Sequence, residues 1–178
     1  MDPTLDATIL KLILLFVMEK MEIPLTSNSI LDICSSRNNW INYMECKDII
    51  FQLQEADFIY KTDPDSDEVR FALTYSGRNC LAHFYQRIPS NLRDEIIEYT
   101  KENRLQVKRS QEYIGDYFKN TDGSYTIVLK IRSPLLNESM FEIRVKAPSR
   151  QSAIESVKKW RDKAPNVYEY IFETLVDI

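Results

Sequence analysis

The spacing of apolar residues changes along this chain, and the change limits the folds open to it. Up to about residue 103 apolar side chains recur every three to four positions, apart from two short alternating segments at 58–62 and 69–73. From residue 104 the period is two, as in the segments around 105–119, 125–131 and 141–145. The first spacing is typical of amphipathic helices and the second of half-buried strands. The sequence therefore predicts an α+β chain with a helical front and a sheet-containing rear.

The front part, residues 1–87, is expected to hold four helices and one hairpin. Its helices are predicted at residues 5–20, from Thr26 to about residue 36, from Asn42 onward, and from Thr74 to about residue 87. The two alternating segments predict the hairpin, with the acidic DPDSDE (63–68) as its tip. The first helix is apolar nearly all round, so either its own domain or a second subunit must cover it.

The rear part is expected to follow a polar connector helix at residues 88–103. Residues 104–178 read as β-β-β-α-α, a small antiparallel sheet covered by helices, with a dimerisation or sensor role expected for it. Asp122 and Gly123 form the pair favoured in type I′ hairpin turns, which makes the first two strands antiparallel neighbours. Pro165 is expected to open the last helix.

Composition and motifs exclude several classes of function. The chain of 178 residues has three cysteines without C-x-x-C spacing and a single histidine, so no metal site or disulfide is predicted. It carries no nucleotide-binding or hydrolase motif, so neither a catalytic residue nor a cofactor is expected, and the chain is not predicted to be an enzyme. The apolar run at residues 9–18 is too short to cross a membrane and lacks the features of a secretory signal, which favours a cytoplasmic location.

Two stretches carry a resemblance to known proteins. IIFQLQEADFIYKT (49–62) looks like a recognition helix that runs into the first strand of a wing. RFALTYSGRNCLAHF (70–84) is similar to the leucine-threonine-x-x-glycine junction of winged-helix transcription regulators of the multiple-antibiotic-resistance and phenolic-acid types. Over its full length the chain resembles an uncharacterised two-domain family from Gram-positive bacteria. The resemblance implies a dimeric regulator that binds double-stranded DNA with its third helix in a major groove.

Polar residues of the front part supply the candidate DNA contacts. Arginine pairs with guanine or phosphate, asparagine pairs with adenine, and lysine neutralises phosphate. The candidates are Arg37, Asn38, Asn39, Asn42, Lys47, Lys61 and Arg70. The three asparagines also suit turns and a helix cap, which leaves a purely structural interpretation open for them.

Charge argues for a second interpretation of the same fold. Residues 1–87 hold 8 basic and 13 acidic side chains, and the hairpin tip contains four of the acidic ones. An acidic tip repels phosphate instead of binding it. The alternative is a winged helix that binds a protein partner through its acidic tip and through Met44 and Phe51, which are expected to be exposed. Any small-molecule effector stays unidentified at this point.

Overall fold

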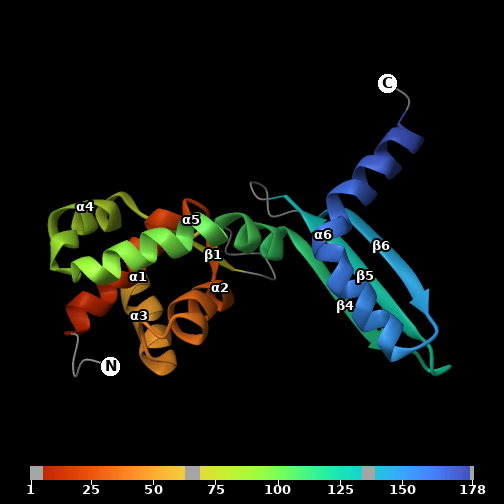
Figure 1. Cartoon of the computed structure of the whole chain (residues 1–178), viewed down its shortest axis with the longest axis horizontal. Coiled ribbons are helices and arrows are strands. Elements are labelled where there is room, and N and C mark those ends of the chain that lie inside the picture. The colour runs from red at the N-terminus through yellow and green to blue at the C-terminus, as the bar shows by residue number, and fades with distance from the viewer. Residues whose placement is uncertain (1–5, 63–68, 134–138, 177–178) are drawn as a thin grey trace. The chain divides into compact units, whose positions relative to one another are not determined.

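The chain forms two compact units, Met1–Leu105 and Gln106–Ile178. The computed structural model describes residues 6–62, 69–133 and 139–176. The first unit consists mainly of helices with a small sheet, and the second is a three-stranded sheet with one long helix (Figure 1). The α+β class predicted from the change in period is therefore confirmed.

The first unit holds the expected helices and hairpin together with one two-residue strand that the pattern did not predict. In chain order its elements are α1 (Ala7–Met21), β1 (Leu25–Thr26), α2 (Ser27–Leu31), the π-helical turn η1 (Asp32–Arg37), α3 (Tyr43–Glu55), β2 (Ile59–Lys61), β3 (Arg70–Leu73), α4 (Tyr75–Phe84) and the 3-10 turn η2 (Tyr85–Arg87). Helix α5 (Ser90–Glu112) begins in this unit and ends in the second. The second helix expected from the sequence is thus α2 continued by η1.

Helix α1 forms the centre of the first unit. Every residue from Leu12 to Met18 is buried, as are Leu10 and Met21. Other parts of the unit surround the helix, chiefly α3, α4 and β3. Of the two covers considered for this apolar helix, its own domain is therefore the one that the structure provides. The buried stretch of α1 therefore leaves no apolar surface for contact with a second subunit.

The small sheet of the first unit has the strand order β1-β3-β2. Strands β2 and β3 pair antiparallel with Ile59 opposite Leu73, which confirms the predicted hairpin, whereas its tip at residues 63–68 lies outside the described residues. Strand β1 adds to the other side of β3, with Leu25 opposite Phe71. Two residues are too few to show an alternating pattern, so β1 was not predictable from periodicity.

The boundary between α5 and the rear sheet differs from the prediction. Residues 105–112 were expected to begin a strand, but they continue α5, and β4 starts only at Tyr113. The alternation of Leu105 and Val107 suggested a strand. However, the residues beside them, Gln106, Lys108 and Arg109, are good helix formers and extend the preceding helix.

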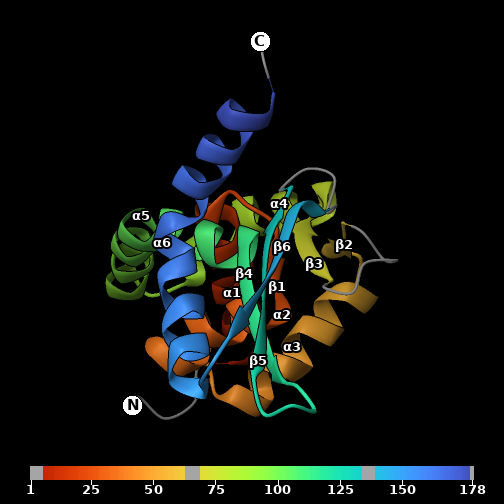
Figure 2. The same ribbon diagram turned by 90° about the vertical axis from the view of Figure 1, so that its right-hand side faces the viewer.

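The second unit is an antiparallel sheet in the order β4-β5-β6, covered on one face by α6 (Figures 1 and 2). Its strands are β4 (Tyr113–Lys119), β5 (Tyr125–Arg132) and β6 (Ser139–Ala147), and its helix is α6 (Arg150–Leu175). Ile127, Ala147 and Ala153 form one buried cluster between sheet and helix, and Ile131, Trp160 and Ala164 form another. The Trp160 indole N–H also donates to the Lys130 carbonyl oxygen at 3.1 Å, which ties α6 to β5.

The turn between β4 and β5 is not the type I′ turn predicted from Asp122 and Gly123. Type I′ needs a positive φ at both central residues. Gly123 has φ 84°, but Asp122 is not among the described residues with positive φ. Asn120 and Ser124 instead close a three-residue loop, with the Asn120 N–H donating to the Ser124 carbonyl at 2.8 Å. The antiparallel pairing that the prediction implied is nevertheless present.

The rear part is β-β-β-α, not β-β-β-α-α. Pro165 lies inside one continuous helix, α6, and does not begin a second one. Proline removes one backbone hydrogen bond but fixes φ near the helical value, so a helix anchored on both sides can continue through it with a bend. The anchors are Trp160 and Ala164 before the proline and Tyr168, which packs edge-on against Phe141, after it. Figure 1 shows α6 changing direction between its two halves.

Candidate nucleic-acid interface

Helix α3 is the helix expected from the sequence to enter a DNA major groove, and hydrogen bonds fix both of its ends. The Asn42 side chain caps its first turn by accepting from the Met44 N–H at 3.0 Å. Its inner face is buried through Cys46, Ile49, Ile50 and Leu53. A capped helix with one buried stripe leaves its opposite face fully available to a partner.

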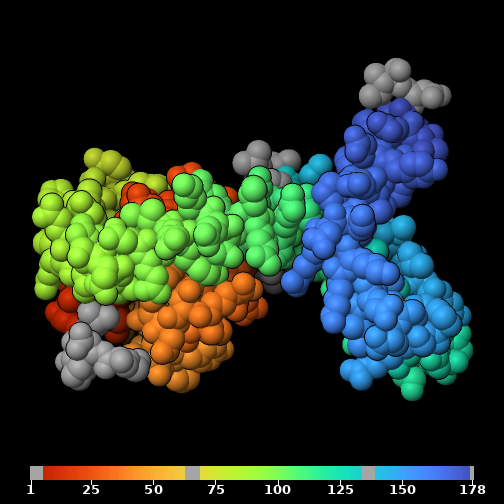
Figure 3. Space-filling model, in the orientation of Figure 1, coloured from red at the N-terminus to blue at the C-terminus, as the bar shows by residue number. Residues whose placement is uncertain are grey.

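The outer face of α3 mixes apolar and charged side chains. Met44 is 64% exposed and Phe51 is 63% exposed, as the sequence predicted. Lys47, Asp48 and Glu55 are also exposed on this helix. Figure 3 shows the orange atoms of the α2–α3 region at the surface of the first unit. We call Met44, Lys47, Asp48 and Phe51 the α3 outer face.

The turn that ends α3 is held by the start of α4. Thr74 caps α4 by accepting from the Gly77 N–H at 3.0 Å, and its own hydroxyl donates to the Asp57 carbonyl at 2.6 Å. The Thr74 N–H donates to the Phe58 carbonyl at 3.1 Å. Asp57 has φ 56°, the left-handed conformation that ends α3. The leucine-threonine-x-x-glycine junction therefore fixes where α3 stops and β2 begins.

Helical spacing in α4 predicts that Cys80, Leu81 and Phe84 face the core. Leu81 is buried as predicted, together with Gly77, and Cys80 is half-buried. Phe84 is instead 48% exposed. Gly77 lies so close to the Phe58 carbonyl that α4 approaches this turn by its backbone. The helix therefore rotates Gly77 and Leu81, four residues apart, toward the core and carries Phe84 outward.

The candidate contacts before α3 already make bonds within the protein. Arg37 forms an ion pair with Asp32 at 2.5 Å, which raises the pKa of the arginine. The Asn38 amide donates to the Ile33 carbonyl at 2.8 Å. Asn39 is exposed and has φ 52°, a left-handed turn position that asparagine tolerates. The structural roles considered for the asparagines are thus present for Asn38, Asn39 and Asn42.

The three remaining candidates differ in their access to solvent. The Lys47 ammonium lies 4.8 Å from the centre of the Tyr43 ring, a cation–π contact that leaves it exposed. Lys61 is exposed on the edge strand β2. Arg70 is only 4% exposed, so its guanidinium is not offered to a ligand at the surface. Asn39, Asn42 and Lys47 therefore lie exposed around the start of α3, whereas Arg70 is buried.

Trp40 is a packing residue that connects the α3 region with α5. Its indole N–H donates to Glu95 at 2.9 Å, and its ring meets Tyr99 edge-on with centroids 5.6 Å apart. Burial raises the pKa of Tyr99, so the phenol stays neutral. These contacts hold the turn before α3 against α5. Sequence spacing did not show that partnership because the residues are far apart in the chain.

Two cysteines near α3 form a hydrogen bond with each other and are both buried as free thiols: Cys34 and Cys46. The hydrogen bond with Cys46 raises the pKa of Cys34 most, and burial raises it further. The same bond lowers the pKa of Cys46. Among the described residues no three His, Cys, Asp or Glu side chains are arranged to hold a metal ion. No helix in the described ranges is both long and apolar enough to cross a membrane.

The comparisons with known proteins give one match. The family described as "Domain of unknown function (DUF4364)" matches residues 10–175. No curated protein and no solved structure matches the chain. The match is to a family of unknown function and spans both units. The chain belongs to the DUF4364 family.

Proposed function

We propose that this protein is a dimeric winged-helix transcription regulator that binds double-stranded DNA with α3 in the major groove. The observation that carries the proposal is α3 itself, which has one stripe buried in the helical core and the other exposed along its length. An α-helix presented in this way fits the width of the major groove. The β2–β3 hairpin would serve as the wing beside it.

The chemistry for base contact lies around the first turn of α3. Asn42 uses its side-chain oxygen for the cap, which leaves its amide N–H groups as donors. Asn39 and Lys47 are exposed in the same region of the chain. In helix-turn-helix proteins the N-terminal residues of the recognition helix contact base edges. We therefore assign Asn39 and Asn42 to base contact and Lys47 to phosphate.

Charge makes a dimer necessary for adequate affinity. Arg37 is neutralised by Asp32, which leaves Lys47 and Lys61 as the cations of the candidate set that have no carboxylate partner among the described residues. Two protomers would then make about four phosphate contacts, which corresponds to a salt slope of about −3.6. We place the pairing surface in the second unit, because the buried stretch of α1 has no free apolar face.

The test is the binding of pooled genomic fragments, followed by fluorescence anisotropy between low and moderate salt. Lys47→Glu should weaken binding and reduce the magnitude of the salt slope by about 1.8, because the dimer loses two phosphate contacts. Lys101→Glu on α5 is the matched control, because it changes the same charge on an exposed lysine of the same unit and should have a smaller effect. Absence of any binding at low salt, or equal losses in both variants, contradicts the DNA proposal.

The exposed apolar residues of α3 favour a second candidate function, the binding of a protein partner. Met44 and Phe51 lie on the α3 outer face beside Asp48, and side chains of this kind are typical of protein interfaces. Phe51→Ser should then abolish cross-linking to one defined partner, whereas Tyr75→Ser on α4, which replaces another exposed aromatic side chain of the same unit, should retain it. A Phe51→Ser variant that binds DNA poorly but keeps all its protein cross-links favours the first candidate.

A further inference from the structure

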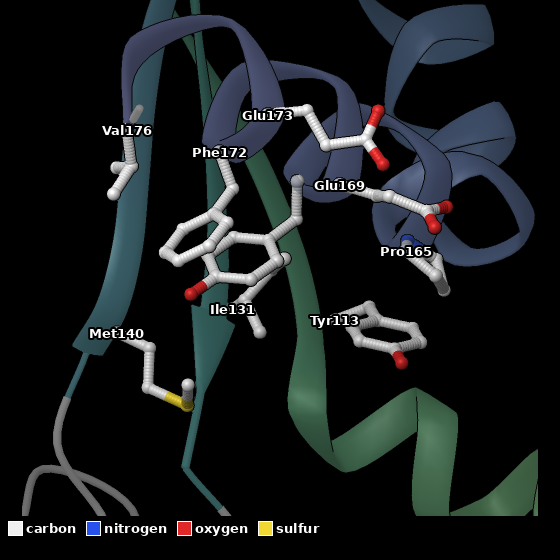
Figure 4. A pocket seen from close by; sticks show the side chains of 9 residues that line it. Tyr113, Ile131, Met140, Pro165, Glu169, Phe172, Glu173 and Val176 are labelled. Atoms are coloured by element: carbon white, nitrogen blue, oxygen red, sulfur yellow. The ribbon is translucent and has the colours of Figure 1, made fainter. Parts of the chain in front are cut away.

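The second unit contains a cavity that the proposed DNA-binding role does not use. Its volume is about 820 Å³, within the range of small-molecule sites. It lies between the last turns of α6 and one end of the sheet, with Ile131 of β5 and Met140 of β6 on the sheet side (Figure 4). Tyr113 from the start of β4 closes a third side.

The course of α6 explains why the cavity stays open. Up to Ala164 the helix is anchored on the sheet, with Trp160 buried beside Phe141. Beyond Pro165 the helix continues in a different direction (Figure 1). Tyr168 still stacks on Phe172, but Phe172 is not buried. The described residues thus leave the aromatic side of the last turns uncovered above the end of the sheet.

The wall of the cavity has a definite chemical character. Tyr113, Tyr168 and Phe172 supply aromatic rings. Glu169 and Glu173 stand one helical turn apart on the same side of α6, as Figure 4 shows. Neither carboxylate forms an ion pair within the described part of the chain, and the described residues that line the cavity include no lysine, arginine or histidine.

Tyr113 adds a neutral polar group to this wall. Burial raises the pKa of its phenol, Glu112 raises it further, and Arg109 acts in the opposite direction. The ring therefore stays protonated at neutral pH and keeps its negative π face. Aromatic faces and unpaired carboxylates together attract a positive charge that carries an apolar body. An anion would meet repulsion from Glu169 and Glu173 and no cation among the lining residues that the structure describes.

We propose that this cavity binds an amphipathic organic cation, with its apolar body against Ile131, Met140 and Phe172 and its positive charge near Glu169 and Glu173. This site is independent of the α3 outer face. It needs no metal and no covalent step, because recognition rests on burial, cation–π contact and charge complementarity.

The experiment uses two probes of the same shape and opposite charge. Tetraphenylphosphonium and tetraphenylborate are titrated separately into the full-length protein at low salt, and the heat of binding is measured. The phosphonium should bind and the borate should not. The double variant Glu169→Gln/Glu173→Gln should weaken phosphonium binding about five- to tenfold. Both residues are exposed, so their replacement should leave the thermal unfolding midpoint unchanged.

A matched control separates the site from the net charge of α6. Glu155→Gln/Asp162→Asn removes the same charge from exposed positions of this helix outside the cavity and should bind the phosphonium as the wild type does. Equal binding of both probes, or equal losses in the two double variants, overturns the proposal. So does a protein that binds neither probe.

Discussion

Replacing Gly77 by alanine should destabilise the first unit, although the same change in most helices is favourable. Gly77 lies in the first turn of α4, where alanine gains about 1 kcal/mol over glycine from helix propensity. A Cβ at this position would overlap the Phe58 carbonyl oxygen and lie 3.0 Å from the Phe58 carbonyl carbon. The obstacle is backbone, so a side-chain rotation cannot relieve it.

The size of the effect follows from what must move. Overpacking of this kind costs about 1–3 kcal/mol, and here the upper end applies because two backbone segments have to separate. Displacing the Phe58 carbonyl also strains its hydrogen bond with the Thr74 N–H, worth about 1 kcal/mol. After the gain in helix propensity, Gly77→Ala should lower the free energy of unfolding by about 2–3 kcal/mol.

Urea denaturation in a Trp160→Phe background, followed by the fluorescence of Trp40 in the same unit as Gly77, measures this loss. Ser76→Ala is the control, because Ser76 is exposed on the same turn and its replacement should be neutral or slightly stabilising. If Gly77→Ala is as stable as the wild type, the close approach of α4 to the end of α3 is wrong. The explanation of the glycine in the junction then fails with it.

Three further outcomes are expected. Asn42→Ala removes the α3 cap and should cost about 1 kcal/mol in urea denaturation, and no loss would contradict the cap. The pKa of Asp122 is lowered by its hydrogen bond with Lys146, so this carboxylate stabilises the fold above about pH 4. The stabilisation is lost as acid protonates the group. The stability of Asp122→Asn should therefore depend less on pH below about pH 4 than that of the wild type. Cys80 should react with a thiol reagent in the native state well before Cys34 does, as mass spectrometry of the labelled protein can show.

Basic residues on the rear sheet form ion pairs with acidic side chains of the same unit. Lys130 and Arg144 both pair with Glu142, at 3.0 and 2.8 Å, and Lys146 pairs with Asp122 at 2.6 Å. The Lys130–Glu142 pair joins β5 to β6 and the Lys146–Asp122 pair joins β6 to the β4–β5 turn, so both depend on register, whereas Arg144 and Glu142 lie on the same strand. Their presence favours an ordinary solvated sheet face over an anion-binding surface.

Local patterns predicted the elements whose stability is local. The hairpin, the caps at Thr26, Asn42 and Thr74, and the exposure of Met44 and Phe51 all follow from spacing and capping rules. These features depend on residues a few positions apart. Most of the front unit and the outer face of its third helix could therefore be predicted from the sequence.

The features that could not be predicted depend on distant parts of the chain. Pro165 reads as a helix start, but packing of Tyr168 on Phe141 lets α6 continue. Arg70 reads as a surface cation, yet its strand lies between β1 and β2, and β1 has no pattern of its own. The cavity at the end of α6 likewise requires the bend at Pro165, which no local rule shows.

Each unit contains one tryptophan, so intrinsic fluorescence can report on the unfolding of each unit. Trp40 is buried in the first unit with its N–H on Glu95, and Trp160 is buried in the second with its N–H on the Lys130 carbonyl. The chain has no other tryptophan. Replacing either indole by phenylalanine leaves an emission signal from one unit alone, so a pair of single-tryptophan proteins can tell whether the units melt in one cooperative transition or in two.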